Sequence, residues 1–405
     1  MQEANSLRIP TFYMKYLGTM KVLHLTTCAS RNAGGLFNSV RRLTFETRQN
    51  GIDVRVGAVR DSETLADSGA WAPVPLSTFP GLGPHGFRYS PGLWNWVKES
   101  HAEALHLHGL WQFTAFVANR WQRSTGRPLV VSPHGMLEPW ALQQSRWKKR
   151  LAGLAFQSEC LHRAACIRAT SEMEAESIRS AGYRNPIILI PNGVAIPRSL
   201  PDKPSREDRT RTALFLSRIH PKKGLPELLH AWRKASDCDP KTVSGWQLLI
   251  VGPDEGGHLA EVLRLADQLG LGKAVRYGGS VWNEEERALL YRSADFFVLP
   301  TFSENFGMVI AEALASGTPV VTTVGAPWRE LESHGCGQWI PFGIEPLTES
   351  LLSLMRADDT ERALMGKRGQ DLVSRRYGWA SVGLKMAETY RWLFGGDRPE
   401  FVLGS

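Results

Sequence analysis

Two glutamates in one short stretch have the chemistry to bind a polar ligand. Glu304 lies in a polar turn after the apolar run 294–299, and Glu312 follows eight residues later in an apolar segment. The pattern predicts a buried strand over the apolar run, a helix over about 306–316 and a further strand over 318–323. A carboxylate on such a helix needs a partner, because an unpaired buried charge is costly.

The start of this helix is a candidate phosphate site, formed by Asn305, Phe306, Gly307 and Met308. The first N–H groups of a helix have no intrahelical acceptors and lie at the positive end of its dipole. Gly307 would let a phosphate approach the backbone closely. The stretch therefore indicates a ligand whose phosphate binds amides and whose vicinal hydroxyls bind carboxylates. The alternative is a capped core helix with one hydrogen-bonded glutamate.

Arg218 and Lys223 are two of the cations in the loop 217–224, between the predicted strand 213–216 and a helix that begins at Leu225. Arg218 can grip phosphate oxygens with its planar fork of donors, and Lys223 adds a point charge. The pair predicts a clamp for a diphosphate, and the alternative is a basic, solvated turn. The chain has no DxD pair at a suitable position, so no metal is required, and the cations would take its role.

Three histidines, His106, His108 and His134, lie where the predicted strands 105–109 and 129–137 run into loops. Open α/β sheets bind ligands at the carboxyl ends of their strands. A single histidine of this kind is more often structural, but two such loops favour function.

A glycine turn, Gly34–Gly35, precedes a helix in the first predicted strand–helix–strand unit. It lacks the full G-x-G-x-x-G pattern, so the dinucleotide-binding fingerprint is absent. The turn is either a ligand loop or a plain tight turn. Further along, Ser171 and Glu174 fit a capping box at a helix start.

The 405 residues are too many for one core, and the strand–loop–helix pattern starts twice. We expect a disordered extension over 1–19, a first domain over 20–196 and a second over 211–378. The Pro-rich, charged stretch 196–210 would link them, and an amphipathic helix over 379–396 ends the pattern.

The composition is that of an ordinary globular protein, with 42% hydrophobic and 22% charged residues. The five cysteines are scattered without CxxC spacing, which favours a reducing cytosol and argues against disulfides or a zinc site. No apolar run is long enough for a transmembrane helix. The net charge of +8 favours acidic partners such as nucleotide phosphates or anionic lipids. No nucleic-acid-binding motif is present, which argues against that partner.

Residues 138–157 read as one basic amphipathic helix, in which Trp140, Leu142, Trp147, Leu151 and Leu154 could form an apolar stripe beside Arg146, Lys148, Lys149 and Arg150. Such a helix can lie on an anionic membrane surface. The alternative, which the sequence favours, is a solvated charged face on a core helix.

Residues 303–321, Ser-Glu-Asn-Phe-Gly-Met-Val-Ile-Ala-Glu-Ala-Leu-Ala-Ser-Gly-Thr-Pro-Val-Val, resemble the E-x7-E signature of family 4 retaining glycosyltransferases of the GT-B fold. Arg218 and Lys223 are similar in spacing to the R-x4-K pair of that family. The resemblance extends over about 20–395. It implies an α/β, GT-B protein with two doubly wound Rossmann-like domains facing across a cleft. The first would be the acceptor side and the second would bind the nucleotide-sugar, with the last helix packing back on the first.

The resemblance implies catalytic roles for four residues. Arg218 and Lys223 would neutralise the departing diphosphate, Glu304 would hold the donor-sugar hydroxyls, and His134 would lie beside the reacting carbon. His108 is a weaker candidate, nearer the acceptor.

The resemblance also implies donor-binding roles for further residues. Glu312 would hold the ribose hydroxyls, and the helix start at 305–308 would contact the donor. The loop at Gly34 and Gly35 would face the diphosphate, and Val281 would contact the nucleobase.

The expected activity is transfer of a sugar from a UDP- or GDP-sugar, with retention, to a saccharide or lipid-linked acceptor in cell-surface polysaccharide synthesis. No other cofactor is expected, and the location is cytoplasmic, at the inner face of the membrane. A nucleotide-sugar epimerase or a phosphorylase on the same scaffold, a nicotinamide dehydrogenase and a non-catalytic nucleotide-sugar sensor are the alternatives.

Overall fold

The computed structural model describes residues 19–83, 86–143, 145–197 and 210–404, which form two compact units. The first holds the described residues up to Thr170, together with Glu174–Ile190 and the chain from Val382 onward. The second holds Ser171–Met173 and Pro191–Ser381. The extension expected at 1–19, apart from Thr19, and most of the expected linker lie outside the described residues.

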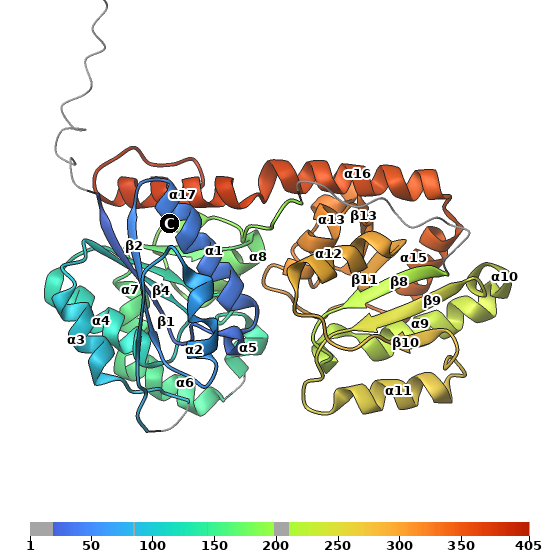
Figure 1. Ribbon diagram of the computed structural model, residues 1–405, viewed down its shortest axis with the longest axis horizontal. Helices are drawn as coiled ribbons and strands as arrows, with labels where there is room; N and C mark the ends of the chain where they lie inside the picture. Colours follow the sequence, from blue (N-terminus) through green and yellow to red (C-terminus); the bar gives the residue numbers. More distant parts are fainter. Residues whose placement is uncertain (1–18, 84–85, 144, 198–209, 405) are drawn as a thin grey trace, which may run out of the picture. The chain divides into compact units, whose positions relative to one another are not determined.

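The described part of the first unit is built on an eight-stranded sheet with the order β14-β7-β6-β5-β4-β1-β2-β3 (Figure 1). Every neighbouring pair is parallel except β14 and β7. The strands between the two edges are rich in apolar residues and mostly buried, as expected for a parallel sheet with covered faces. They are β1 Lys21–Thr26, β2 Asp53–Val59, β3 Leu76–Phe79, β4 Ala104–His108, β5 Leu129–Ser132, β6 Cys166–Ala169, β7 Ile187–Leu189 and β14 Val402–Leu403.

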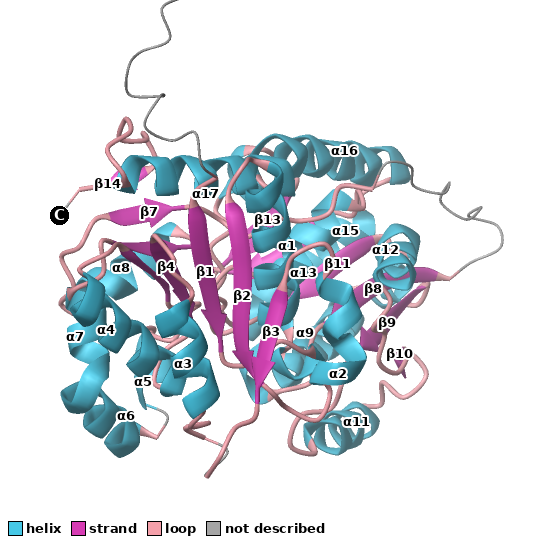
Figure 2. Ribbon diagram, turned by 60° about the vertical axis from the view of Figure 1, so that its left-hand side comes forward, coloured by secondary structure: helices cyan, strands magenta, loops and turns pink. Residues whose placement is uncertain are grey.

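Helices connect these strands, and α17 returns to the unit from the end of the chain (Figure 2). They are α1 Gly35–Gln49, α2 Thr64–Asp67, α3 Pro91–Glu99, α4 Phe113–Thr125, α5 Pro139–Gln143, α6 Arg146–Ala152, the π-helical η4 Gly153–Gln157, α7 Ser158–His162, α8 Glu172–Ser180 and α17 Trp379–Leu393, with short 3-10 turns η2 Arg31–Ala33 and η3 Ser68–Trp71.

The single helix expected over 138–157 is wrong. The segment is divided into α5, α6 and η4, and the backbone of Ser145 turns left-handed between the first two, with a φ of 51°. A left-handed residue cannot continue a right-handed helix, so the apolar stripe predicted from one helical period does not form as a single face.

The second unit is built on a parallel sheet, β10-β9-β8-β11-β12-β13 within the described chain. Its strands are β8 Arg211–Leu216, β9 Trp246–Val251, β10 Val275–Tyr277, β11 Phe296–Leu299, β12 Val320–Thr323 and β13 Gly337–Ile340. Its helices are η6 Pro221–Lys223, α9 Leu225–Cys238, α10 Pro240–Val243, α11 His258–Gln268, α12 Glu284–Ser293, α13 Met308–Ala315, α14 Glu330–Ser333, α15 Ile344–Arg356 and α16 Asp359–Arg376.

Both sheets are doubly wound, which confirms the predicted α/β class. The strand order reverses between β1 and β4 in the first unit and between β8 and β11 in the second. Ligands of open α/β sheets bind at such a reversal, beside the carboxyl ends of the strands. The candidate loops at Gly34, His108, Arg218 and Glu304 follow these four strands. None of the helices in the described ranges is long and apolar enough to cross a membrane.

Candidate functional site

In the second unit, the structure brings Lys223 and Glu304 together. Lys223 ends the 3-10 turn after β8, and the next residue, Gly224, has a φ of 71°. A side chain at Gly224 would collide with the carbonyl oxygen of Pro300, so glycine lets the loops after β8 and β11 touch. Lys223 Nζ forms an ion pair with Glu304 Oε1, and these side chains are only 8% and 14% exposed.

Arg218, the other predicted clamp residue, is placed differently. Its Nη1 lies 2.6 Å from Glu255 Oε2, and the two side chains are 60% and 45% exposed. An exposed ion pair of this kind adds little stability. Its guanidinium can therefore exchange Glu255 for another anion at low cost, whereas Lys223 is fixed beside Glu304.

The loop after Glu304 leads into α13, which begins at Met308 rather than at the expected Phe306. Gly307 precedes the helix with a φ of 80°, and a Cβ there would lie 2.9 Å from Ile310 Cδ1. Trp328 Nε1–H donates to the carbonyl of the buried Phe306 at 2.5 Å. The N–H groups of the first turn of α13 and the glycine bend thus stand directly after the Lys223–Glu304 pair, as an anion site requires.

A buried acceptor of this loop is unused in the part of the chain that the structure describes. The side-chain oxygen Oδ1 of Asn305 is shielded from solvent and has no hydrogen-bond partner there. Leaving such an atom without a donor costs about 1–3 kcal/mol. A ligand hydroxyl would supply the donor.

Glu312 is held by two side chains of α12. Its Oε2 accepts a hydrogen bond of 3.0 Å from the Tyr291 hydroxyl, and its Oε1 lies 3.4 Å from Arg287 Nη2. Burial raises the pKa of Glu312, and the charge of Arg287 opposes this. Sequence reasoning did not identify either partner.

Val281 is half-buried against the core of the second unit. The loop before it is tied to β9, because Gly252 N–H donates to the Gly279 carbonyl at 2.8 Å and the Tyr277 hydroxyl donates to the Gly252 carbonyl at 3.0 Å. The side chain of Val281 offers no polar atom, so any contact with a nucleobase would use its backbone.

In the first unit, Gly34 has a φ of 57° and caps η2, and Gly35 begins α1. A Cβ at either position would meet no atom within 4 Å, so the surrounding space is open. The loop ahead of them is fixed on Asp61, which accepts hydrogen bonds from Cys28 Sγ at 2.6 Å and Ser30 Oγ at 2.9 Å. Burial and the contact with Asp61 raise the pKa of Cys28.

His134 lies in the loop after β5 with a φ of 53°, an uncommon conformation for a residue with a side chain. Glu174 holds this loop, because its Oε1 accepts the Gly135 N–H at 2.6 Å while its Oε2 accepts the Thr170 N–H at 2.8 Å. The capping box had predicted only a local role for Glu174. Burial lowers the pKa of His134 to about 3, so the ring is neutral at physiological pH.

His108 contacts His134 directly, with Nδ1 3.0 Å from His134 Nε2. It is only 1% exposed, so it is positioned to act on His134 rather than to touch an acceptor.

The surface formed by α5, α6 and η4, here called the basic segment, carries large exposed apolar side chains. Trp140, Trp147, Leu151 and Leu154 are 45%, 65%, 58% and 88% exposed. They alternate along the chain with exposed basic residues of α6, among them Lys148 and Arg150. These four side chains therefore lie outside the core, whereas Leu142, the fifth member of the predicted stripe, is half-buried and packs against the core.

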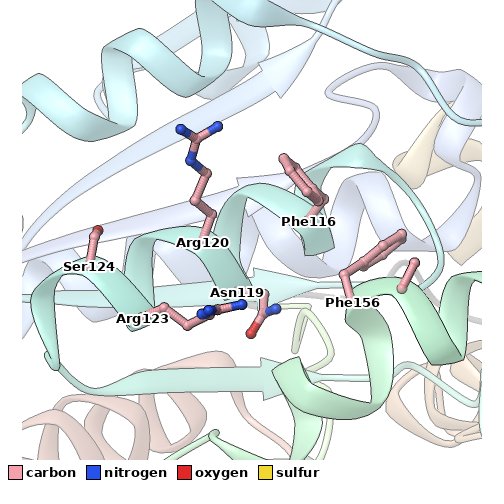
Figure 3. Close-up of a pocket in the computed structure, with 7 residues that line it drawn as sticks. Phe116, Asn119, Arg120, Arg123, Ser124 and Phe156 are labelled. Atoms are coloured by element: carbon pink, nitrogen blue, oxygen red, sulfur yellow. The ribbon is translucent and has the colours of Figure 1, made fainter.

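Beside the basic segment, α4 borders a hollow of about 470 Å³ (Figure 3). Arg120 lies over the Trp94 ring at 4.4 Å, and Arg123 Nη1 lies 3.4 Å from Glu159. The hollow is lined by Phe116, Asn119, Arg120, Arg123, Ser124, Ala155 and Phe156.

Comparison with known proteins agrees with this geometry. Residues 34–193 match the family described as "Glycosyl transferase 4-like domain", and residues 198–371 match "Glycosyl transferases group 1". Both halves of the chain thus match glycosyltransferases. The chain belongs to family 4 of the GT-B glycosyltransferases.

Similar proteins include enzymes that glycosylate inositol compounds. The chain is 28% identical over 383 residues to the phosphatidyl-myo-inositol mannosyltransferase of Mycobacterium leprae, covering 88% of this chain and 92% of that one. It is 28% identical over 320 residues to a D-inositol 3-phosphate glycosyltransferase of Streptomyces bingchenggensis, covering 74% of this chain and 68% of that one.

Solved structures share the fold. HepE of Anabaena, in complex with UDP and glucose, matches with a TM-score of 0.73 and 22% identity over 92% of this chain and 99% of that one. Sucrose-phosphate synthase of Thermosynechococcus elongatus matches with a TM-score of 0.74 and 19% identity over 93% and 100%.

Proposed function

We propose that this glycosyltransferase moves a sugar from a UDP- or GDP-sugar to a saccharide or lipid-linked acceptor, with retention of anomeric configuration. The observation that carries the proposal is the Lys223–Glu304 pair directly ahead of the Gly307 helix start. A nucleoside diphosphate sugar offers phosphates to Lys223 and the amides, and hydroxyls to Glu304 and Asn305.

Charge develops on the diphosphate as it departs, and the proposed chemistry opposes that charge. Lys223 Nζ has three N–H groups, so it can bind a phosphate oxygen while keeping Glu304. Arg218 adds a second cation when it exchanges Glu255 for the diphosphate. Lys223 is already fixed beside Glu304, and a fixed donor stabilises a transition state without reorganisation. No metal is needed for this neutralisation.

Retention is inferred from the family resemblance. The departing diphosphate and the incoming acceptor would use the same face of the sugar. The half-buried His134, whose pKa is lowered to about 3 by burial, would lie beside the reacting carbon. Because Nε2 of this neutral imidazole already bonds His108, Nδ1 is left to donate or to accept there, without adding a charge that competes with the oxocarbenium-like centre.

Two observations support a lipid-linked acceptor: the name of one relative and the composition of the basic segment. The mannosyltransferase of M. leprae is named for a phosphatidylinositol acceptor. In this chain the basic segment combines exposed Trp147 and Leu154 with lysine and arginine, the composition that binds anionic membrane interfaces. The protein would then work at the cytoplasmic face of a membrane, in the synthesis of a cell-surface polysaccharide.

The test is thermal denaturation with UDP, GDP, ADP or NAD, each near millimolar, with and without magnesium. A ligand at 100 times its dissociation constant adds about 2.7 kcal/mol, which is a shift of a few degrees. We expect a shift with UDP or GDP that is lost in Lys223→Ala. Lys234→Ala is the matched control, because Lys234 forms an exposed ion pair with Glu345 in the same unit.

Transfer kinetics complete the test. Arg218→Ala and Lys223→Ala should each lower kcat by about 10²–10³-fold, as for a lost transition-state donor. Arg218→Ala should change stability little, because its ion pair with Glu255 is exposed. A nucleotide shift that survives Lys223→Ala, or near-normal transfer in either variant, would overturn the clamp. Turnover of the nucleotide sugar without acceptor would instead favour an epimerase.

A further inference from the structure

A chain of hydrogen bonds leads from His134 into the interior of the first unit. His134 Nε2 lies 3.0 Å from His108 Nδ1, and His108 Nε2 lies 2.9 Å from His24 Nδ1. His24 Nε2 lies 2.9 Å from the hydroxyl of Tyr390, on α17. Each of the two inner histidines therefore uses both ring nitrogens.

The chain continues beyond Tyr390 to the end of β5. The Tyr390 hydroxyl lies 2.7 Å from His106 Nδ1, and His106 Nε2 lies 2.7 Å from Ser132 Oγ. We call these six residues the histidine chain. Every link is 3.0 Å or shorter, and Tyr390 connects two halves that would otherwise be separate.

The sheet explains why the rings meet. His24 pairs with His106 across β1 and β4, and His106 and His108 are two residues apart on β4. Alternate residues of a strand point to the same face of a sheet, so the three rings share one face. Tyr390 reaches that face from α17 and is itself fully buried.

The rings are neutral. Burial lowers the pKa of His24 to about 3, and it lowers the pKa values of His106 and His108 well below the ordinary value. The positive charge of buried Arg168 acts in the same direction on these rings. A further cation is therefore disfavoured, although the ligand atoms of His24, His106 and His108 lie within 4.8 Å of one another. Hydrogen bonds account for this cluster better than a metal ion does.

A neutral imidazole carries one N–H, so one ring nitrogen donates and the other accepts. If His108 Nδ1 donates to His134, then His108 Nε2 must accept from His24, which in turn must accept from Tyr390. The same logic continues through His106 to Ser132. If the Tyr390 hydroxyl also donates its own proton within the chain, only two arrangements satisfy every link: all protons point toward His134, or all point toward Ser132.

We propose that Tyr390, His24 and His108 are positioning residues that fix the tautomer of His134, because the proton positions along the histidine chain are coupled to one another. In one arrangement His134 carries its proton on Nδ1, the ring nitrogen outside the chain, and in the other Nδ1 is an acceptor. Helix α17 thereby controls, through one hydroxyl, what His134 presents to a substrate. The kinetic part of this inference rests on the proposed function.

The first test removes that hydroxyl. Tyr390→Phe should lower kcat about 10–100-fold, because it removes a residue that orients His134 without touching the substrate. The KM for the donor should change little. In a His134→Ala background the same substitution should cause no further loss. A merely structural role would lower kcat in both backgrounds.

The control is Tyr183→Phe, which removes a buried tyrosine hydroxyl of the same unit outside the chain. If Tyr390→Phe does not fold, Ser132→Ala removes only the last link and serves in its place. Equal losses of kcat from Tyr390→Phe in both backgrounds would overturn the proposal.

The second test does not need activity. Nitrogen-15 spectra of histidine-labelled full-length protein near pH 7 should show one protonated and one bare ring nitrogen for His24, His106, His108 and His134. In Tyr390→Phe, His134 should populate both tautomers. An unchanged His134 tautomer would overturn the inference even if transfer is never observed. A mixed tautomer with no transfer by the parent protein would uphold it and reject the proposed function.

Discussion

The carboxylate of Glu312 has more acceptor positions than its two partners on α12, Tyr291 and Arg287, use. A carboxylate can accept about four hydrogen bonds, and the structure assigns one donor to each oxygen, Tyr291 to Oε2 and Arg287 to Oε1. Ribose hydroxyls would use the remaining lone pairs. The alternative, a glutamate that only anchors α12 to α13, uses the same two contacts.

Glu312→Gln separates these alternatives. If the carboxylate binds ribose, the substitution should raise the KM for the nucleotide-sugar about tenfold, which is 1.4 kcal/mol, and leave kcat nearly unchanged. Steady-state kinetics and melting curves should be compared with Tyr291→Phe, which removes a partner of the same carboxylate but no ligand contact. A lower melting temperature with an unchanged KM would show that Glu312 is structural.

At the scale of elements, periodicity predicted the regular parts of both sheets. The predicted strand 213–216 lies within β8, and the apolar run 294–299 contains β11, because a buried parallel strand needs an uninterrupted apolar sequence. The prediction of a single helix over 138–157 was wrong because the spacing of apolar residues does not reveal a single residue with positive φ. Ser145 breaks the helix although nothing in its residue type requires it.

Membrane contact of the basic segment can be tested directly, since Leu151 and Leu154 are exposed and contribute little to the core. Leu151→Ser combined with Leu154→Ser should weaken sedimentation with vesicles containing anionic lipid several-fold, and salt should weaken binding of the parent protein.

Leu364→Ser is the matched control, because Leu364 is 55% exposed on α16 of the second unit. Parent protein that stays in the supernatant with anionic vesicles at low salt would remove the membrane from the proposed function.

At the scale of the whole molecule, contacts distant in sequence explain what could not be predicted. The glycine-containing loops of the second unit and their charged residues can be recognised from the local sequence. Lys223 and Glu304 were chosen as candidate ligand-binding residues on that basis. Tyr390 meets His106 across 284 residues, and no local pattern marks either as a partner. The same holds for Glu174, which bonds Gly135 from 39 residues away.

The return of the chain to its first unit includes a close approach between two helices. Helix α17 packs against α1 at Gly383, where an added Cβ would lie 2.7 Å from the backbone carbon of Glu46 and overlap its side chain (Figure 1). Backbone cannot yield as a flexible side chain does. Glycine at this position therefore lets Tyr390, two turns further along α17, reach the histidine face of the sheet.

Gly383→Ala in the full-length chain should therefore destabilise the first unit by about 1–3 kcal/mol, the usual cost of overpacking. Its melting temperature should fall by several degrees. Gly153→Ala is the control, because its Cβ would meet only Ser158 Oγ at 3.5 Å and alanine favours a helix. Equal melting temperatures for the two variants would contradict the close approach. If Gly383→Ala also mixes the tautomers of His134, the position of α17 and the state of that ring are coupled as the histidine chain requires.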